Sequence, residues 1–168
     1  MGKWMQIWMF TLVLAFICSG SETIGIIEEE VPQENKNIMD SNELAIVTKV
    51  SFSGDENNYS FNVTISSPDT GCDQYADWWE VLDLDGNLIY RRILAHSHVN
   101  EQPFTRSGGA IAIATDTEVY VRVHMNNSSY GTMAMKGSAS NGFESVNLSP
   151  DFAKALENEA PLPSGCAF

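Results

Sequence analysis

The feature that most constrains the fold is a strict alternation of apolar and polar residues at positions 59–66. Aromatic and β-branched residues occupy the odd positions, and serine, asparagine or threonine occupies each even position. Because successive side chains of a β-strand point to opposite faces, this pattern predicts a strand with one buried face. The segment at residues 68–71, Pro-Asp-Thr-Gly, is typical of a turn and ends the strand.

Short runs of similar character recur from residue 44 to residue 148. Asp85-Gly86 predicts a tight hairpin between two of them. Turn signals return every eight to twelve residues or so, as expected for an antiparallel sandwich. The sequence therefore predicts an all-β antiparallel sandwich of about seven strands. The runs from which these strands are expected lie at residues 44–52, 59–66, 78–84, 88–94, 110–114, 119–124, 133–136 and 143–148.

The first twenty residues have the parts of a secretory signal peptide. Lys3 is the only charge before Glu22, and an apolar run follows it at residues 4–18. Small residues come next, so cleavage after Gly20 is the first expectation. The alternative is a bacterial lipoprotein with a lipid on Cys18, although Ile17 is larger than the residue that usually precedes such a cysteine. Residues 21–43, which are acidic and poor in apolar residues, are expected to form a solvated linker.

The cysteine count supports export. Of the three cysteines in the chain, Cys18 belongs to the leader, so Cys72 and Cys166 remain as each other's only partner. A disulfide between them would close a loop of about 95 residues, worth roughly 4–5 kcal/mol in the chain-entropy model and often less in practice. Its expected role is to hold residues 149–168 against the domain. Ser149, Pro150 and Asp151 predict the start of a short helix in that segment.

Charge and motifs exclude several functions. Twenty-two acidic against nine basic residues give a net charge of −13, which is the wrong sign for a nucleic-acid partner. Cleavage after Gly20 removes only Lys3 and leaves −14, so we expect membrane contact only through the leader or a lipid anchor. The sequence contains no nucleotide-binding, serine-hydrolase or zinc-protease motif, and a non-enzyme is favoured.

Residues 75–94, YADWWEVLDLDGNLIYRRIL, resemble the central hairpin of immunoglobulin-like sandwiches. They are most similar to the superoxide reductase (desulfoferrodoxin) domain, in which an aromatic strand, an Asp-Gly turn and paired arginines occur in this order. The family's iron ligands are missing, because Gln74 stands where a histidine is needed and no cysteine lies near His124. The resemblance thus implies an immunoglobulin-like sandwich without the enzyme. The segments GCDQYADWWEV, HSHVNEQPFTRSGG and GCAF also resemble secreted bacterial proteins, which implies no function.

Three histidines are the candidate metal ligands. His96 and His98 share a face if their strand continues, and His124 ends another strand. Together they could form a three-nitrogen site for copper, zinc or iron, with Glu101 or water in the open position. The alternative is that each imidazole bonds to the backbone or to water, since nothing in the sequence makes these strands neighbours.

The polar segment at residues 96–109 is the candidate binding surface. Arg106 could pair with a carboxylate and Phe104 could anchor a partner, beside Glu101 and Gln102. The structural alternative is that Phe104 plugs the end of the sandwich while Arg106 pairs with an acid of this chain. The sequence therefore predicts an exported, non-catalytic binding or accessory protein whose partner is a protein or small ligand. An extracytoplasmic copper-, zinc- or iron-binding protein is the alternative, with no cofactor otherwise expected.

Overall fold

The computed structural model describes residues 44–167. The predicted signal peptide, the linker at residues 21–43 and the lipidation candidate Cys18 lie outside the described residues, so they stay predictions. Among residues 44–167, no helix is long and apolar enough to cross a membrane.

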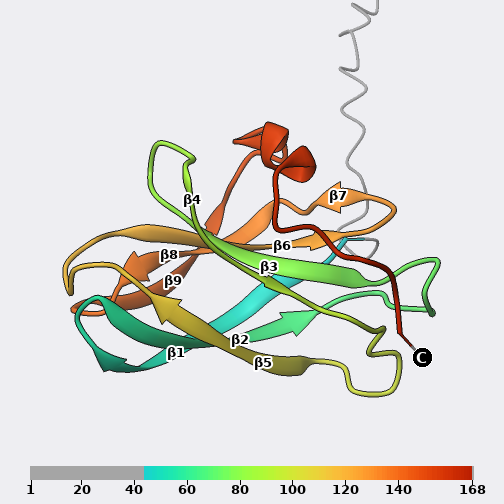
Figure 1. Cartoon of the computed structure of the whole chain (residues 1–168), viewed down its shortest axis with the longest axis horizontal. Helices are drawn as coiled ribbons and strands as arrows, with labels where there is room; N and C mark the ends of the chain where they lie inside the picture. The colour runs from blue at the N-terminus through green and yellow to red at the C-terminus, as the bar shows by residue number, and fades with distance from the viewer. Residues whose placement is uncertain (1–43, 168) are drawn as a thin grey trace, which may run out of the picture. The chain divides into compact units, whose positions relative to one another are not determined.

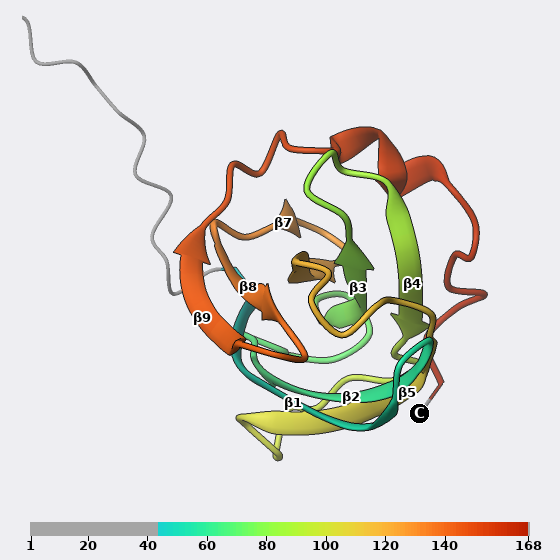
Figure 2. The same ribbon diagram turned by 90° about the vertical axis from the view of Figure 1, so that its left-hand side faces the viewer.

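The fold is an all-β sandwich of two antiparallel sheets, as the sequence predicts (Figure 1). One sheet has the order β1-β2-β5, and the other has the order β4-β3-β6-β8-β9, with β7 paired to β6. The strands are β1 (Ile46–Asp55), β2 (Asn58–Ser66), β3 (Ala76–Leu82), β4 (Leu88–Ile93), β5 (Phe104–Ile111), β6 (Val119–Met125), β7 (Ser129–Tyr130), β8 (Met133–Ser138) and β9 (Gly142–Asn147). Figure 2 shows the two layers edge on.

The core lies between the sheets and follows the alternation of the sequence. On β2, the apolar odd positions are buried and the intervening polar residues are partly or fully exposed. The inner face of β3 contributes Trp79 and Val81, which are fully buried. Every residue of β3 is buried, including those that point away from the core. Something must therefore cover the outer face of this central strand.

That cover is the C-terminal strap, which we define as residues 149–167. It runs over β3 and β4 on the side away from the three-stranded sheet (Figure 2). The predicted helix is present only as a short 3-10 helix, η1 (Lys154–Asn158), because Ala153 adopts a left-handed conformation (φ 47°) and Ser149–Asp151 forms a turn before it. The predicted disulfide between Cys72 and Cys166 is present and ties the end of the strap to the domain.

A buried charge cluster lies beneath the strap. Glu80 on β3 is fully buried, and its carboxylate pairs with Arg91 of β4 at 2.6 Å and with Arg122 of β6 at 2.7 Å. Strand register brings the three together, because both arginines lie directly opposite Glu80. Burying charges is favourable only when they are paired and their remaining donors are satisfied.

The strap satisfies those remaining donors with its backbone. Arg91 donates to three main-chain carbonyls at 2.6, 3.1 and 2.8 Å, and Arg122 donates to two more. The acceptors are the carbonyl oxygens of Phe152, Ala153, Leu156, Glu159 and Pro161. The cluster thus holds the strap in place through main-chain atoms, whatever the side chains of the strap are.

The structure corrects the position of one predicted strand. We expected a loop at residues 96–109 and a strand at 110–114, but β5 covers Phe104–Ile111 and pairs with β2. β5 is an edge strand with polar residues on its exposed face, so its sequence resembles a loop. Gly108 is required where β5 approaches the other sheet: an added Cβ would lie 2.8 Å from Trp79 and 2.7 Å from the Tyr90 hydroxyl.

Candidate functional site

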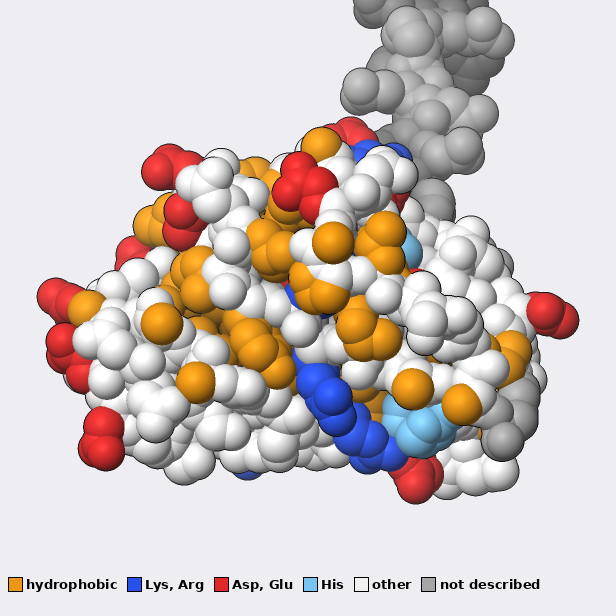
Figure 3. All heavy atoms as spheres, viewed as in Figure 1, with side chains coloured by type: hydrophobic (Ala, Val, Ile, Leu, Met, Phe, Trp, Pro, Cys, Tyr) orange, Lys and Arg blue, Asp and Glu red, His pale blue; other side chains and the backbone are white. Residues whose placement is uncertain are grey.

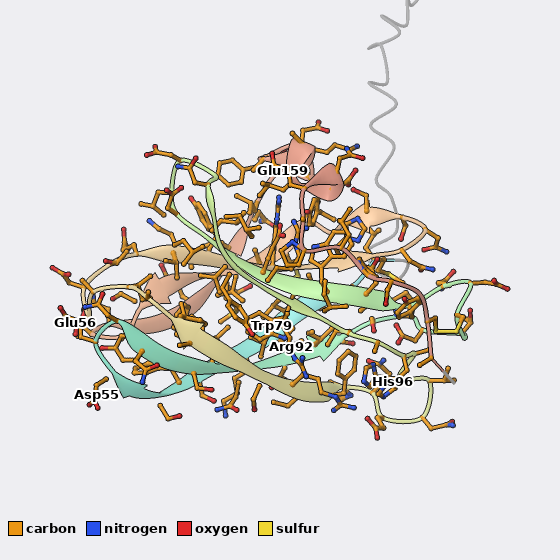
Figure 4. The ribbon with its side chains drawn as sticks, in the orientation of Figure 1. Asp55, Glu56, Trp79, Arg92, His96 and Glu159 are labelled. Carbon is orange, nitrogen blue, oxygen red and sulfur yellow. A yellow bond between two sulfur atoms is a disulfide. The ribbon has the colours of Figure 1, made fainter. Side chains whose placement is uncertain are left out.

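The β4–β5 corner is the candidate site, and we define it as Arg92, His96, His98, Glu101, Phe104 and Arg106. β4 and β5 are edge strands of different sheets, and the chain between them forms the corner. In Figure 4, Trp79, Arg92 and His96 follow one another from the centre of the sandwich to this corner, with Asp55 and Glu56 at the opposite end. Figure 3 shows lysine or arginine side chains adjoining imidazoles on the same face.

Stacked rings form the inner wall of the corner. Phe104 is 3% exposed and stacks on His98, with ring centroids 3.8 Å apart and an interplanar angle of 12°. The guanidinium carbon of Arg106 lies over the Phe104 ring at 5.3 Å. Phe104 therefore closes the end of the sandwich, which was the alternative to its being an anchor for a partner. It is too buried to contact a partner directly.

Arg106 forms an ion pair with Glu101 in the corner. It is half-exposed, and its Nη2 lies 2.7 Å from Oε2 of Glu101, whose side chain is 60% exposed. This pair lowers the pKa of Glu101. An exposed pair of this kind contributes about 0–1 kcal/mol, so an external anion can replace Glu101 at little cost.

Gln102 fixes the loop from within. Its side-chain oxygen accepts from the Ser67 backbone N–H at 2.9 Å, and its amide donates to the Ser67 hydroxyl and to the carbonyl oxygen of His98. These bonds join the loop to the end of β2. Gln102, a predicted binding residue, is thus committed to holding the corner in shape.

Asp69 organises the inner side of the corner, although its segment in the sequence is typical only of a turn. Its carboxylate accepts from the Ser67 hydroxyl at 2.6 Å and from the backbone N–H groups of Ala76 and His98 at 3.0 and 2.7 Å. No local signal distinguishes such an aspartate from an ordinary turn residue, because two of its partners, the backbone N–H groups of Ala76 and His98, lie 7 and 29 residues further along the chain. Its effect is to fix the backbone at His98.

His98 is buried, and its Nδ1 lies 3.9 Å from Oδ2 of Asp69, too far for a hydrogen bond. It is 3% exposed, and neither Nδ1 nor Nε2 forms a hydrogen bond within the described residues. Burial lowers the pKa of His98, and the nearby Arg106 and His96 lower it further. The ring of His96, which is exposed, lies beside it at a centroid distance of 4.5 Å.

The third candidate metal ligand, His124, belongs to a different environment. Its Nδ1 lies 2.7 Å from Asp77, and its ring stacks on Trp78 at 3.6 Å beneath the strap. Burial raises the pKa of Asp77, whereas the bond to His124 opposes that rise. In residues 44–167 no group of three or more His, Cys, Asp or Glu side chains is placed to hold a metal ion. The structure therefore brings His96 and His98 together but leaves out His124, because β6 presents it to the strap.

The remaining cations of the described chain are mostly neutralised. Arg91 and Arg122 share Glu80, Lys136 lies 3.1 Å from Glu118, and Lys154 lies 4.0 Å from Asp151. Between residues 44 and 167, no ion pair involves Arg92 or Lys49. Arg92 is exposed and lies in the corner. In the sequence, Arg92 is distinguished only as part of a predicted hairpin.

Comparison with known proteins gives one informative similarity. The chain is 37% identical over 102 residues to a protein of Halomicrobium mukohataei named "Putative lipoprotein". The matched residues are 60% of this chain and 50% of that protein, so the chain spans about half the length of the curated relative it matches. No family model matches the chain, and no solved structure matches it.

Proposed function

We propose that this chain is an exported, non-catalytic binding module, tethered to the membrane by a lipid on Cys18, which contacts its ligand through the β4–β5 corner. The tether is supported by the name of the Halomicrobium mukohataei relative and by the position of Cys18 at the end of an apolar run. The Cys72–Cys166 disulfide supports an oxidising compartment, because such bonds rarely persist in the cytosol.

The observation that carries the binding role is the state of the cations in the corner. Arg106 pairs with one exposed carboxylate and donates from Nη1 to the Thr105 carbonyl at 2.9 Å, and Arg92 has no ion pair within residues 44–167. They project from a corner that Gln102 and Asp69 hold rigid. Side chains placed on the strands of a rigid scaffold are held more precisely than those on a loop, which suits a binding role.

Site-specific photocrosslinking in the producing cell tests the binding role. A photoreactive residue at Val99, which is 45% exposed in the corner loop, should yield a discrete adduct. The same residue at Asp55, at the opposite end of the sandwich, should not (Figure 4). The Val99 adduct should disappear in an Arg92→Gln background. Equal adducts at both positions, or a Val99 adduct that survives Arg92→Gln, would overturn the assignment of the corner.

The mass of the mature N-terminus tests the tether separately. A lipid-modified Cys18 as the first residue is the expected result. A mature chain that begins at Ser21 without lipid would show that the protein is released after cleavage, and the tether would then be wrong.

A further inference from the structure

We infer that the β4–β5 corner is an oxyanion site, in which Arg92, Arg106 and His96 bind a doubly charged phosphate or sulfate group. This inference rests on the proposed binding function and names the chemistry of its ligand.

Strand geometry places the two arginines side by side. Tyr90 and Arg92 lie opposite Val81 and Trp79 in the β3–β4 pairing, so both point toward the other sheet. Gly108 of β5 lies against Tyr90 and Trp79, as the short distances to an added Cβ show. β4 and β5 run in opposite directions where they pass (Figure 1). Two residues along each strand from that contact, Arg92 therefore faces Arg106.

The fold alone gives no reason for this juxtaposition. Two guanidinium groups on neighbouring edge strands repel each other, and like charges placed opposite one another destabilise a sheet. The chain carries 22 acidic residues, and yet within residues 44–167 no acid pairs with Arg92. A bound anion would remove the repulsion, and it would do so at an accessible edge.

The donor set favours a dianion over a single carboxylate. One guanidinium suffices for a carboxylate, as the contact between Arg106 and Glu101 illustrates. Two arginines together provide the charge and the planar donor arrangement that phosphate and sulfate oxygens match. The exposed imidazole of His96, beside the buried ring of His98, adds a further donor at the rim.

Glu101 acts in this arrangement as an internal competitor. It accepts from Nη2 of Arg106, while Nη1 donates to the Thr105 carbonyl, so an external oxyanion competes with Glu101 for the Nη2 donor. Its removal should therefore strengthen binding. A purely structural corner predicts no such gain, which makes the direction of this change diagnostic.

The test is a titration of the mature protein with inorganic phosphate, sulfate and acetate, followed by the arginine Nε–Hε resonances in ¹H–¹⁵N spectra. Phosphate and sulfate should shift the signals of Arg92 and Arg106 saturably, and acetate should bind at least about tenfold more weakly. Arg92→Gln should weaken binding by about tenfold or more, whereas Glu101→Gln should strengthen it several-fold. Lys49→Gln is the matched control, because Lys49 is an exposed cation without an ion pair in residues 44–167, and it should change nothing.

The pH dependence shows whether the charge of the anion drives binding. Comparison of dianion binding with the Val99 adduct separates this inference from the proposed function. Phosphate affinity should rise from about pH 6 to about pH 8, as the second proton is lost, while sulfate affinity should not. No saturable shift with either dianion, or equal affinities in wild type and Arg92→Gln, would overturn the oxyanion site. If the dianions fail to bind while the Val99 adduct persists and depends on Arg92, the binding function stands with another ligand class. If they bind but no adduct forms, the proposed function fails instead.

Discussion

Two groups of charged residues in this protein contain arginine, and they differ in burial and in pairing. Beneath the C-terminal strap, Arg91 and Arg122 are buried, share Glu80 and donate to strap carbonyls. At the β4–β5 corner, Arg106 pairs with an exposed acid and Arg92 has no ion pair within the described residues. Arg91 and Arg92 are adjacent in the sequence, but one lies beneath the strap and the other at the corner, because successive side chains of a strand point to opposite faces.

The comparison shows that environment, more than residue type, decides what a cation does here. A buried arginine must be fully satisfied, so the cluster beneath the strap is a structural element whose loss should be severe. An exposed arginine can remain unpaired at small cost, which leaves it free to bind. The following changes should separate the two groups, with the largest effect first.

Glu80→Gln should have the largest effect. It leaves two buried guanidinium groups without a counter-charge, and breaking such a buried pair typically lowers the free energy of unfolding by about 3–5 kcal/mol. Urea denaturation measures it. Glu118→Gln is the matched control, since Glu118 pairs with Lys136 at 3.1 Å in an exposed position and should contribute less than about 1 kcal/mol. Similar losses for both variants would show that burial does not set the strength of the cluster.

Removal of the disulfide should come next. The double variant Cys72→Ser, Cys166→Ser frees a long loop and should lower the free energy of unfolding by about 2–4 kcal/mol in the same urea experiment. The Arg91 and Arg122 contacts should still hold the strap, so protection of the β3 amides against hydrogen exchange should persist under native conditions. Loss of that protection would show that the disulfide, and not the arginine cluster, keeps the strap in place.

Acid should destabilise the corner through His98. The pKa of His98 is lowered in the folded protein from its usual 6.5, so below about pH 6.5 the unfolded chain takes up a proton that the native ring resists. Stability should therefore fall as the pH drops through this range. His98→Gln should reduce the difference in unfolding free energy between about pH 7.5 and about pH 5.5. His96→Gln is the control, and an equal reduction there would contradict the assignment to the buried ring.

The smallest effect should come from the exposed pair at the corner. A double-mutant cycle with Arg106→Gln and Glu101→Gln should give a coupling energy of about 0.2–1 kcal/mol that falls with added salt. Thermal or urea unfolding at low and high ionic strength measures it. A coupling as large as the effect of Glu80→Gln would mean that the corner is built for stability, which would weaken its proposed role in binding.

The sequence predicted much of the architecture, and the failures have a common cause. The all-β sandwich is confirmed, and strands such as β2 and β3 lie close to their predicted positions. The predicted position of β5 was wrong because its Arg-Ser-Gly-Gly sequence lacks an alternation of apolar and polar residues. Only its pairing with β2 makes this segment a strand. The resemblance to the superoxide reductase domain and the immunoglobulin-like topology stay predictions.

The candidate site was predicted in part. The segment at residues 96–109 does form the corner, and Arg106 does meet an acid of the chain. Phe104 proved to be core, and His124 proved to lie under the strap. Arg92 was missed because its significance comes from β5, which is remote in the sequence and passes beside it only in the folded chain.

The sequence by itself determined the class of fold, the only cysteine pairing open to an exported domain, and the polar segment at residues 96–109 that contributes to the corner. Those features depend on local periodicity and on counting, which need no knowledge of neighbours. Only the tertiary structure decided which arginines are buried with Glu80, which ones lie at the β4–β5 corner, and which histidines meet. Such neighbours are set by strand register and sheet packing, and these bring together residues that no local pattern relates.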